Sequence, residues 1–276
     1  MGNSKADETK KLVQAVIDQL MEGVLKRVLS EDPFVPAEHE KKKPLYAALV
    51  PEEIWKGSHF ERRFTTPFGH VWEKLAQVVA ENAGDYAERE HSITGVVKRD
   101  RLGRIGEILN NLEHSKKGDD KVKPDWGNEI KYILKGKGPD IPVTVICDLY
   151  TENRSNSKKY AYEIKAPLPN SDQTKVSKEK ILKLHCMRPK KIDHAYYALP
   201  YNPFGSKKVD YKWSFPNRWF NMQSDEVVLI GKEFWDTIGG IGAYQGFVDA
   251  IREIGPKYKD IIYRKFLGVE PPKNLK

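Results

Sequence analysis

Cysteine is scarce in this chain: Cys147 and Cys186 are the only two among 276 residues. Two cysteines so far apart supply neither a zinc site nor a disulfide framework, so both are expected in the core. The seven histidines never form an H-x-x-x-H pair or a similar metal-ligand spacing, and His185 is expected to be structural. These absences argue against a zinc protein and against a nuclease whose metal is held by histidine.

Long apolar runs are also missing, since none approaches the roughly 20 residues of a membrane span. The N-terminal residues MGNSKADETKK lack the apolar centre of a signal peptide. Ala6 stands where the myristoylation pattern requires Ser or Thr. We therefore expect a cytoplasmic protein. There is also no internal repeat and no Walker-type phosphate loop.

Positive charge is in excess: Lys plus Arg number 47 against 39 for Asp plus Glu, a net charge of +8. A basic surface attracts polyanions because binding releases their counterions. Many basic proteins bind no nucleic acid, so this excess favours a nucleic-acid partner only modestly.

Hydrophobic periodicity predicts a mixture of helices and strands. The predicted helices cover residues 5–30, 67–83, 175–187 and 243–254. The predicted strands cover 141–150, 159–165, the stretch HAYYALPYNPFG from residue 194, and 226–231. Pro33, Pro36 and the run Lys41–Lys43 indicate a loop, and residues 84–128 are polar without a clear pattern. This order predicts an α/β or α+β fold with a mixed sheet flanked by helices.

Two neighbouring strands carry the residues that point to chemistry. The strand 141–150, the polar turn 152–158 and the strand 159–165 predict an antiparallel hairpin. Asp140 precedes the first strand, and antiparallel pairing is expected to return Glu163 and Lys165 to the same edge. Asp148 is a rival for the first carboxylate, but it is expected near the hairpin tip and is ranked below Asp140.

Two converging carboxylates suit a hard cation such as Mg²⁺, which keeps several waters and bridges to phosphates. Asp140 and Glu163 are the predicted ligands, and the backbone carbonyl of Ile164 is an additional candidate. Lys165 would hold the attacking water and stabilise developing negative charge. The alternative is a solvated strand edge, because an E-x-K pattern alone means little when 31% of residues are charged. The Pro139-Asp140 pair upstream favours a metal-dependent phosphodiesterase site.

The order of P-D, an apolar strand and Glu163-Ile164-Lys165 resembles the PD-(D/E)xK nucleases. The flanks narrow the resemblance to type II restriction endonucleases of the TdeIII-like family, which recognise GGNCC, over roughly residues 55–270. The segments that carry it are residues 60–69 (FERRFTTPFG), Trp72-Glu73, Pro169-Asn170, residues 197–203 (YALPYNP), Phe234-Trp235 and Gly239-Gly240.

The resemblance implies a PD-(D/E)xK core with Asp140, Glu163 and Lys165 in the catalytic positions. It also implies that Glu73 faces the metal site, directly or through water, although a surface carboxylate paired with a lysine is an equal alternative. The substrate would be double-stranded DNA, cut to leave 5′-phosphate ends by a homodimer whose two-fold axis matches the DNA. A DNA methyltransferase would protect the host's sites. Residues 1–50 would form an N-terminal helix and linker, and residues 51–276 the endonuclease domain.

Base reading is the least specified step. Guanine offers two major-groove acceptors to Arg or Lys, but most basic residues contact phosphate or solvent. The favoured DNA-contact candidates are Arg188, Lys190, Lys191, Lys207, Lys208 and Arg218. The aromatic residues Tyr211, Trp213 and Phe215 nearby are better explained by core packing.

Three functions remain open from the sequence. The first is a Mg²⁺-dependent restriction endonuclease. The second is a PD-(D/E)xK repair or structure-specific nuclease, which would cut by DNA shape. The third is a non-catalytic DNA-binding protein, against which the presence of all three catalytic residue types argues.

Overall fold

The computed structural model describes residues 2–115 and 122–274. It divides into two compact units, one formed by Asn3–Val71 with Gln245–Lys276 and the other by Trp72–Tyr244. The boundaries fall inside helix α4 (Glu52–Asn82) and near the start of helix α9 (Ala243–Ile261). The functional division into residues 1–50 and 51–276 stays a prediction.

The first unit is helical. It contains α1 (Gly2–Lys26), the π-helical turn η1 (Arg27–Glu31), α2 (Pro36–Lys42), α3 (Pro44–Ala47), most of α4 and α9, and η4 (Ile262–Leu267). Ion pairs from Lys10 to Glu253 (2.5 Å) and from Lys257 to Asp18 (2.6 Å) join α1 to α9.

The predicted helix over residues 5–30 is confirmed by α1. The predicted loop around Pro33–Lys43 is wrong in part, because α2 forms there with Pro36 in its first turn. Proline is tolerated at that position because its missing N–H would have no intrahelical partner.

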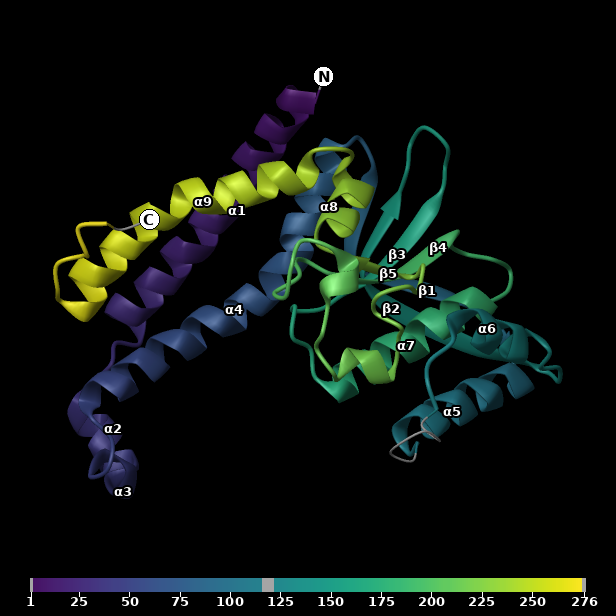
Figure 1. The fold of residues 1–276 in the computed structure, drawn as a ribbon, viewed down its shortest axis with the longest axis horizontal. Helices are drawn as coiled ribbons and strands as arrows, with labels where there is room; N and C mark the ends of the chain where they lie inside the picture. Colours follow the sequence, from purple (N-terminus) through teal and green to yellow (C-terminus); the bar gives the residue numbers. More distant parts are fainter. Residues whose placement is uncertain (1, 116–121, 275–276) are drawn as a thin grey trace. The chain divides into compact units, whose positions relative to one another are not determined.

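The second unit is built on a five-stranded mixed sheet in the order β1-β2-β3-β4-β5 (Figure 1). Its strands are β1 (Tyr86–Lys98), β2 (Asp140–Glu152), β3 (Lys159–Ile164), β4 (His194–Leu199) and β5 (Val228–Ile230). β1, β2 and β3 pair antiparallel, whereas β4 is parallel to β3 and β5 to β4. The predicted fold class, a mixed sheet flanked by helices, is confirmed.

The helices of this unit are α5 (Arg99–Glu113), α6 (Trp126–Leu134), α7 (Ser171–Cys186), α8 (Lys232–Gly239) and the end of α4. The 3-10 turns η2 (Lys208–Asp210) and η3 (Pro216–Arg218) lie in the connection between β4 and β5. The predicted hairpin, the helix 175–187 and the strands near 194 and 226 are all present. The predicted helix 67–83 is the second half of the longer α4.

Central strand β3 has helices on both faces. Tyr162 points to one face, where its ring contacts Phe234 of α8. Glu163 points to the other, where it meets Ser177 and Lys180 of α7. Alternation along the strand therefore places Glu163 beneath α7.

The start of α7 is fixed by a capping box, in which two side chains satisfy the free N–H groups of the first turn. The Asn170 side chain accepts from the Gln173 N–H (2.8 Å), and the Gln173 side chain accepts from the Asn170 N–H (3.5 Å). Because residues three apart lie on the same helix face, this start directs Ser177 and Lys180 together toward β3.

Candidate active site

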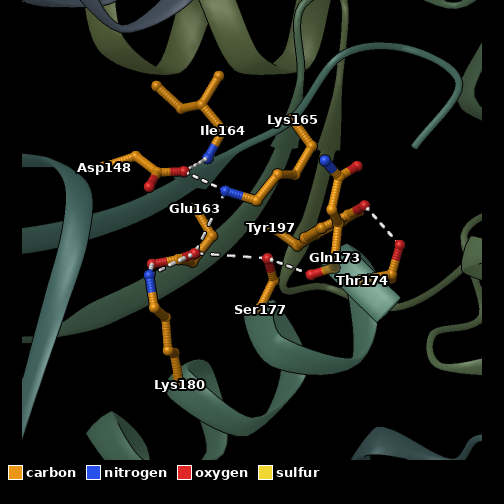
Figure 2. Close-up of polar contacts among 9 residues, drawn as sticks. All are labelled: Asp148, Glu163, Ile164, Lys165, Gln173, Thr174, Ser177, Lys180 and Tyr197. Atoms are coloured by element: carbon orange, nitrogen blue, oxygen red, sulfur yellow. Dashed lines mark hydrogen bonds and ion pairs between the residues drawn. The ribbon is translucent and has the colours of Figure 1, made fainter. Parts of the chain in front are cut away.

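Asp148, Glu163 and Lys165 come together where β3 ends beside the middle of β2 (Figure 2). The Lys165 Nζ lies 2.5 Å from Asp148 Oδ2 and 3.5 Å from Glu163 Oε2. The Lys165 N–H donates to the Ala198 carbonyl of β4 (3.0 Å), so the backbone beyond β3 is held to the sheet. Two carboxylates and an ammonium thus share one face of the sheet.

The prediction that Asp140 joins this group is wrong, as is the placement of Asp148 away from it. Leu149 pairs with Tyr162 in the hairpin, and continuing the register by one residue sets Asp148 opposite Glu163. Asp140 pairs instead with Lys98, and their side chains form an ion pair of 2.9 Å. Eight residues of strand, about 26 Å, separate Asp140 from Asp148.

Unequal strand lengths explain the error. β2 has 13 residues and β3 has 6, so the end of β3 meets the middle of β2 rather than its beginning. Asp140 does begin β2, as predicted, but it lies at the far end of the long β1–β2 ribbon. The proposal of Asp140 as a metal ligand is therefore transferred to Asp148.

Asp148 is fixed by the backbone as well as by Lys165. The Ile164 N–H donates to Asp148 Oδ2 at 2.8 Å, while the Ile164 side chain is buried. This bond holds the Asp148 carboxylate at the end of β3. A metal-ligand role for the Ile164 carbonyl stays a prediction.

Helix α7 supplies two contacts that the sequence analysis missed. Lys180 Nζ lies 2.9 Å from Glu163 Oε1 and 3.1 Å from Oε2, and the Ser177 hydroxyl donates to Oε2 at 3.4 Å. The spacing of Ser177 and Lys180 after the Asn170 cap was a usable signal. Glu163 is thus held by Lys165, Lys180 and Ser177 together (Figure 2).

Burial and charge shift the ionisation of this group. The Glu163 side chain is 2% exposed. Burial, followed by the nearby Asp148 charge, raises the pKa of Glu163 to about 7, against the opposing pull of Lys165 and Lys180. Burial also acts to lower the pKa of Lys165, but the charges of Asp148 and Glu163 outweigh it and the pKa is raised. Lys165 is therefore a stable cation beside a carboxylate that ionises near neutrality.

The donor set fits a divalent metal that keeps much of its water. Within residues 2–115 and 122–274, no three His, Cys, Asp or Glu side chains come together as a metal site. Mg²⁺, however, is typically bound by one or two carboxylates. The Asp148 side chain is partly exposed (17%), and its charge destabilises ionised Glu163. A divalent cation between these carboxylates would relieve that repulsion, so the residues fit such a metal.

Glu73 lies half-buried on α4, one residue after Trp72, whose ring contacts Tyr201 at 6.0 Å. Its role at the metal site stays a prediction.

The DNA-contact candidates divide by their surroundings. Arg188, Lys190 and Lys191 are exposed between α7 and β4, where Lys190 pairs with Asp193 at 3.4 Å. Arg188 donates a hydrogen bond to the Met187 carbonyl (2.8 Å). These three side chains are accessible to DNA, and their contact with it stays a prediction.

Lys207 and Arg218 are also exposed, but Lys208 is not. The Lys208 side chain is 13% exposed and donates to the carbonyls of Asp225 (2.8 Å) and Val228 (2.6 Å). These bonds give Lys208 a structural role beside β5. DNA contact by Lys207 and Arg218 stays a prediction.

Two of the three aromatic residues of this region serve packing, as expected, and Phe215 does not. Tyr211 is buried and donates to the Pro167 carbonyl (2.9 Å), and Trp213 donates to the Pro169 carbonyl (2.9 Å). Both bonds hold the loop that leads from Lys165 to α7. Phe215 remains largely exposed and contacts the Trp213 ring.

The predicted core positions of the two cysteines are confirmed. Cys147 and Cys186 are buried free thiols in the core. His185 is largely buried, and burial lowers its pKa to about 4, so its ring is neutral at ordinary pH. Among the described residues, no helix is both long enough and apolar enough to span a bilayer.

Comparison with known proteins identifies relatives of this chain. The family model described as "Type II restriction endonuclease, HinfI" matches residues 9–255. Among curated proteins, the type II restriction enzyme HgiCII of Herpetosiphon aurantiacus is 26% identical over 228 residues, covering 82% of each chain. The type II restriction enzyme HgiEI from the same organism is 24% identical over 276 residues, covering 96% of this chain and 97% of its own.

Proposed function

We propose that Asp148, Glu163 and Lys165 form the catalytic site of this chain. The chain belongs to the HinfI family of type II restriction endonucleases and is therefore a site-specific deoxyribonuclease. In this proposal the enzyme hydrolyses phosphodiester bonds of double-stranded DNA with Mg²⁺ as cofactor. Restriction endonucleases generally use a divalent metal, and the choice of Mg²⁺ rests on the oxygen donors at the site.

The observation that carries the proposal is the contact of Lys165 with both carboxylates, at 2.5 Å from Asp148 and 3.5 Å from Glu163. Asp148 and Glu163, with the Ile164 carbonyl, would hold the metal. When bound, Mg²⁺ supplies charge that acidifies a water and polarises the scissile phosphate.

The chain's own groups do the remaining work. The Lys165 ammonium donates to the attacking water and to the phosphate oxygen on which negative charge develops. The raised pKa of Lys165 keeps this donor charged throughout the reaction. Asp148 orients Lys165, and the Ile164 N–H orients Asp148 in turn.

The recognition site in this proposal is GGNCC, and the support for it is the likeness of the flanking segments to the TdeIII-like enzymes. Cleavage leaves 5′-phosphate and 3′-hydroxyl ends. A nearly palindromic site favours a homodimer in which each active site cuts one strand. A methyltransferase of the same specificity would protect the host DNA in the cytoplasm, without forming a stable complex with the enzyme.

Digestion of a fully sequenced plasmid with Mg²⁺, followed by end mapping, tests the proposal. We expect discrete fragments whose ends fall at GGNCC, and no cleavage with excess chelator. Discrete ends at another sequence would refute the assigned site alone. Cleavage without discrete, sequence-defined ends would instead indicate a structure-specific nuclease.

A further inference from the structure

Glu163 contacts a second ammonium group, that of Lys180, in addition to the proposed catalytic Lys165. Lys180 contacts both carboxylate oxygens, at 2.9 and 3.1 Å, in addition to the Lys165 contact at 3.5 Å. Two ammonium groups therefore face the two carboxylates of Asp148 and Glu163. When Glu163 is ionised, these four side chains are balanced in charge before any divalent cation binds.

The Lys180 contact uses the groups that a metal would need. A carboxylate that contacts an ammonium through both oxygens directs lone pairs at that cation, and a metal ion requires the same lone pairs. Like charges also repel, so an ammonium in contact with Glu163 opposes a divalent cation bound to the same carboxylate.

Lys180 differs from Lys165 in its freedom to move away. Its side chain is 29% exposed and reaches Glu163 from α7 through a flexible four-carbon stem. Lys165, by contrast, extends from the end of β3 and pairs with Asp148 at the same time. The Lys180 ammonium can turn toward solvent, or toward a phosphate of bound DNA, without a change in the backbone.

We propose that Lys180 is a positioning residue: its ammonium holds the Glu163 carboxylate in the metal-free enzyme and moves away from it when a divalent cation binds. Lys180 thereby sets the cation affinity of the active site. This inference rests on the proposed function, in which Asp148 and Glu163 are the metal ligands.

The test is Mn²⁺ binding to the full chain without DNA, measured from the electron paramagnetic resonance signal of the free ion. Lys180→Met should bind Mn²⁺ on the order of tenfold more tightly, because a unit positive charge near the ion is lost. Lys180→Arg keeps the charge and should bind within about twofold of wild type. Lys183→Met is the matched control, since Lys183 lies on the same helix and pairs with Glu179 at 2.6 Å.

Unchanged or weaker Mn²⁺ binding by Lys180→Met would overturn the inference, and weaker binding would mean that Lys180 only holds Glu163 in shape. If that variant does not fold, Lys180→Gln removes the charge while keeping a hydrogen-bond donor, and the same outcomes apply. Asp148→Asn separates the two proposals. If it leaves Mn²⁺ binding unchanged, the assigned metal site is wrong; if it weakens binding while neutral Lys180 variants leave it unchanged, only the role of Lys180 is wrong.

Discussion

Replacement of Asp148 by Asn removes one negative charge from the active site with almost no change in volume. The side chain of Asp148 accepts from the Lys165 ammonium at 2.5 Å and from the Ile164 N–H at 2.8 Å. Hydrogen bonds to charged groups contribute about 1.5–3 kcal/mol each, so losing the contribution of both costs about 3–6 kcal/mol. Since about 1.4 kcal/mol changes a rate tenfold, we expect cleavage to slow by about 10²–10⁴.

Asp140→Asn is the matched control, because Asp140 is the acidic residue of the Pro-Asp pair. Its side chain is 51% exposed and its partner Lys98 is 41% exposed. An exposed pair of this kind contributes about 0–1 kcal/mol, so the cleavage rate should stay within about fivefold of wild type.

Single-turnover cleavage of a short duplex at saturating Mg²⁺ measures both effects, with DNA binding followed by anisotropy in Ca²⁺. Both variants should bind the duplex, and only Asp148→Asn should cut it about 10²–10⁴-fold more slowly than wild type. If Asp140→Asn abolished cleavage and Asp148→Asn cut normally, the assignment of Asp148 to the active site from the register of the β2–β3 hairpin would be wrong.

Three further predictions follow from buried charges. Because the pKa of Glu163 is raised to about 7, cleavage at limiting Mg²⁺ should rise with pH through about 7, and this rise should move to lower pH at excess Mg²⁺. In metal-free protein, the stability that Glu163 contributes is fully present below its ordinary pKa of 4.5 and is lost as the pH rises through about 7. Urea unfolding in chelator should therefore show that the free energy of unfolding falls more between pH 5 and pH 8 in wild type than in Glu163→Gln. Equal falls in the two proteins would contradict the raised pKa. Lys178 is fully buried and pairs with Glu129 at 2.6 Å, so Lys178→Met should lower the free energy of unfolding by about 3–5 kcal/mol because it leaves a buried carboxylate unpaired. The double variant Lys178→Met/Glu129→Leu should recover most of that loss in the same urea titration, and a single-variant cost below about 1 kcal/mol would show that the pair is not structural.

Local pattern was sufficient for the hairpin and for two of the three proposed catalytic residues. The β-branched run 141–150, the polar turn and the run 159–165 correspond to β2 and β3 within a few residues. Alternation also placed Glu163 and Lys165 on one face and Ile164 on the other. These features depend only on neighbours along the chain.

The identity of the third residue, Asp148, depends on the pairing register of β2 and β3, which the local sequence pattern does not contain. Hairpin register depends on where each strand stops pairing, and β3 stops after 6 residues while β2 continues for 13. Pro139-Asp140 matched the expected motif, yet the pairing of Leu149 with Tyr162 set Asp148 at the site. The contacts of Ser177 and Lys180 depend on how α7 packs on the sheet, which is equally non-local.

The polar segment before the hairpin concealed three elements. β1 was not predicted because many of its positions are exposed and its buried residues do not alternate strictly. α5 buries Ile105, Ile108, Leu109 and Leu112 at helical spacing, so its local pattern was present in the sequence and was missed. α6 is short, with 9 residues, and begins at the Asp125 cap, whose side chain accepts from the Asn128 N–H. Of these three elements, β1 lacked a clear local signal, whereas α5 and α6 carried one.

The central claim is that this chain cuts DNA at a defined sequence through the site that contains Lys165. Its most direct test is digestion of one sequenced plasmid by wild type and by identically purified Lys165→Ala, each with Mg²⁺ and with mapping of every end. We expect discrete wild-type ends at a single recognition sequence and no such ends from Lys165→Ala, which should still fold and bind the plasmid. Identical discrete fragments from both proteins would contradict the central claim.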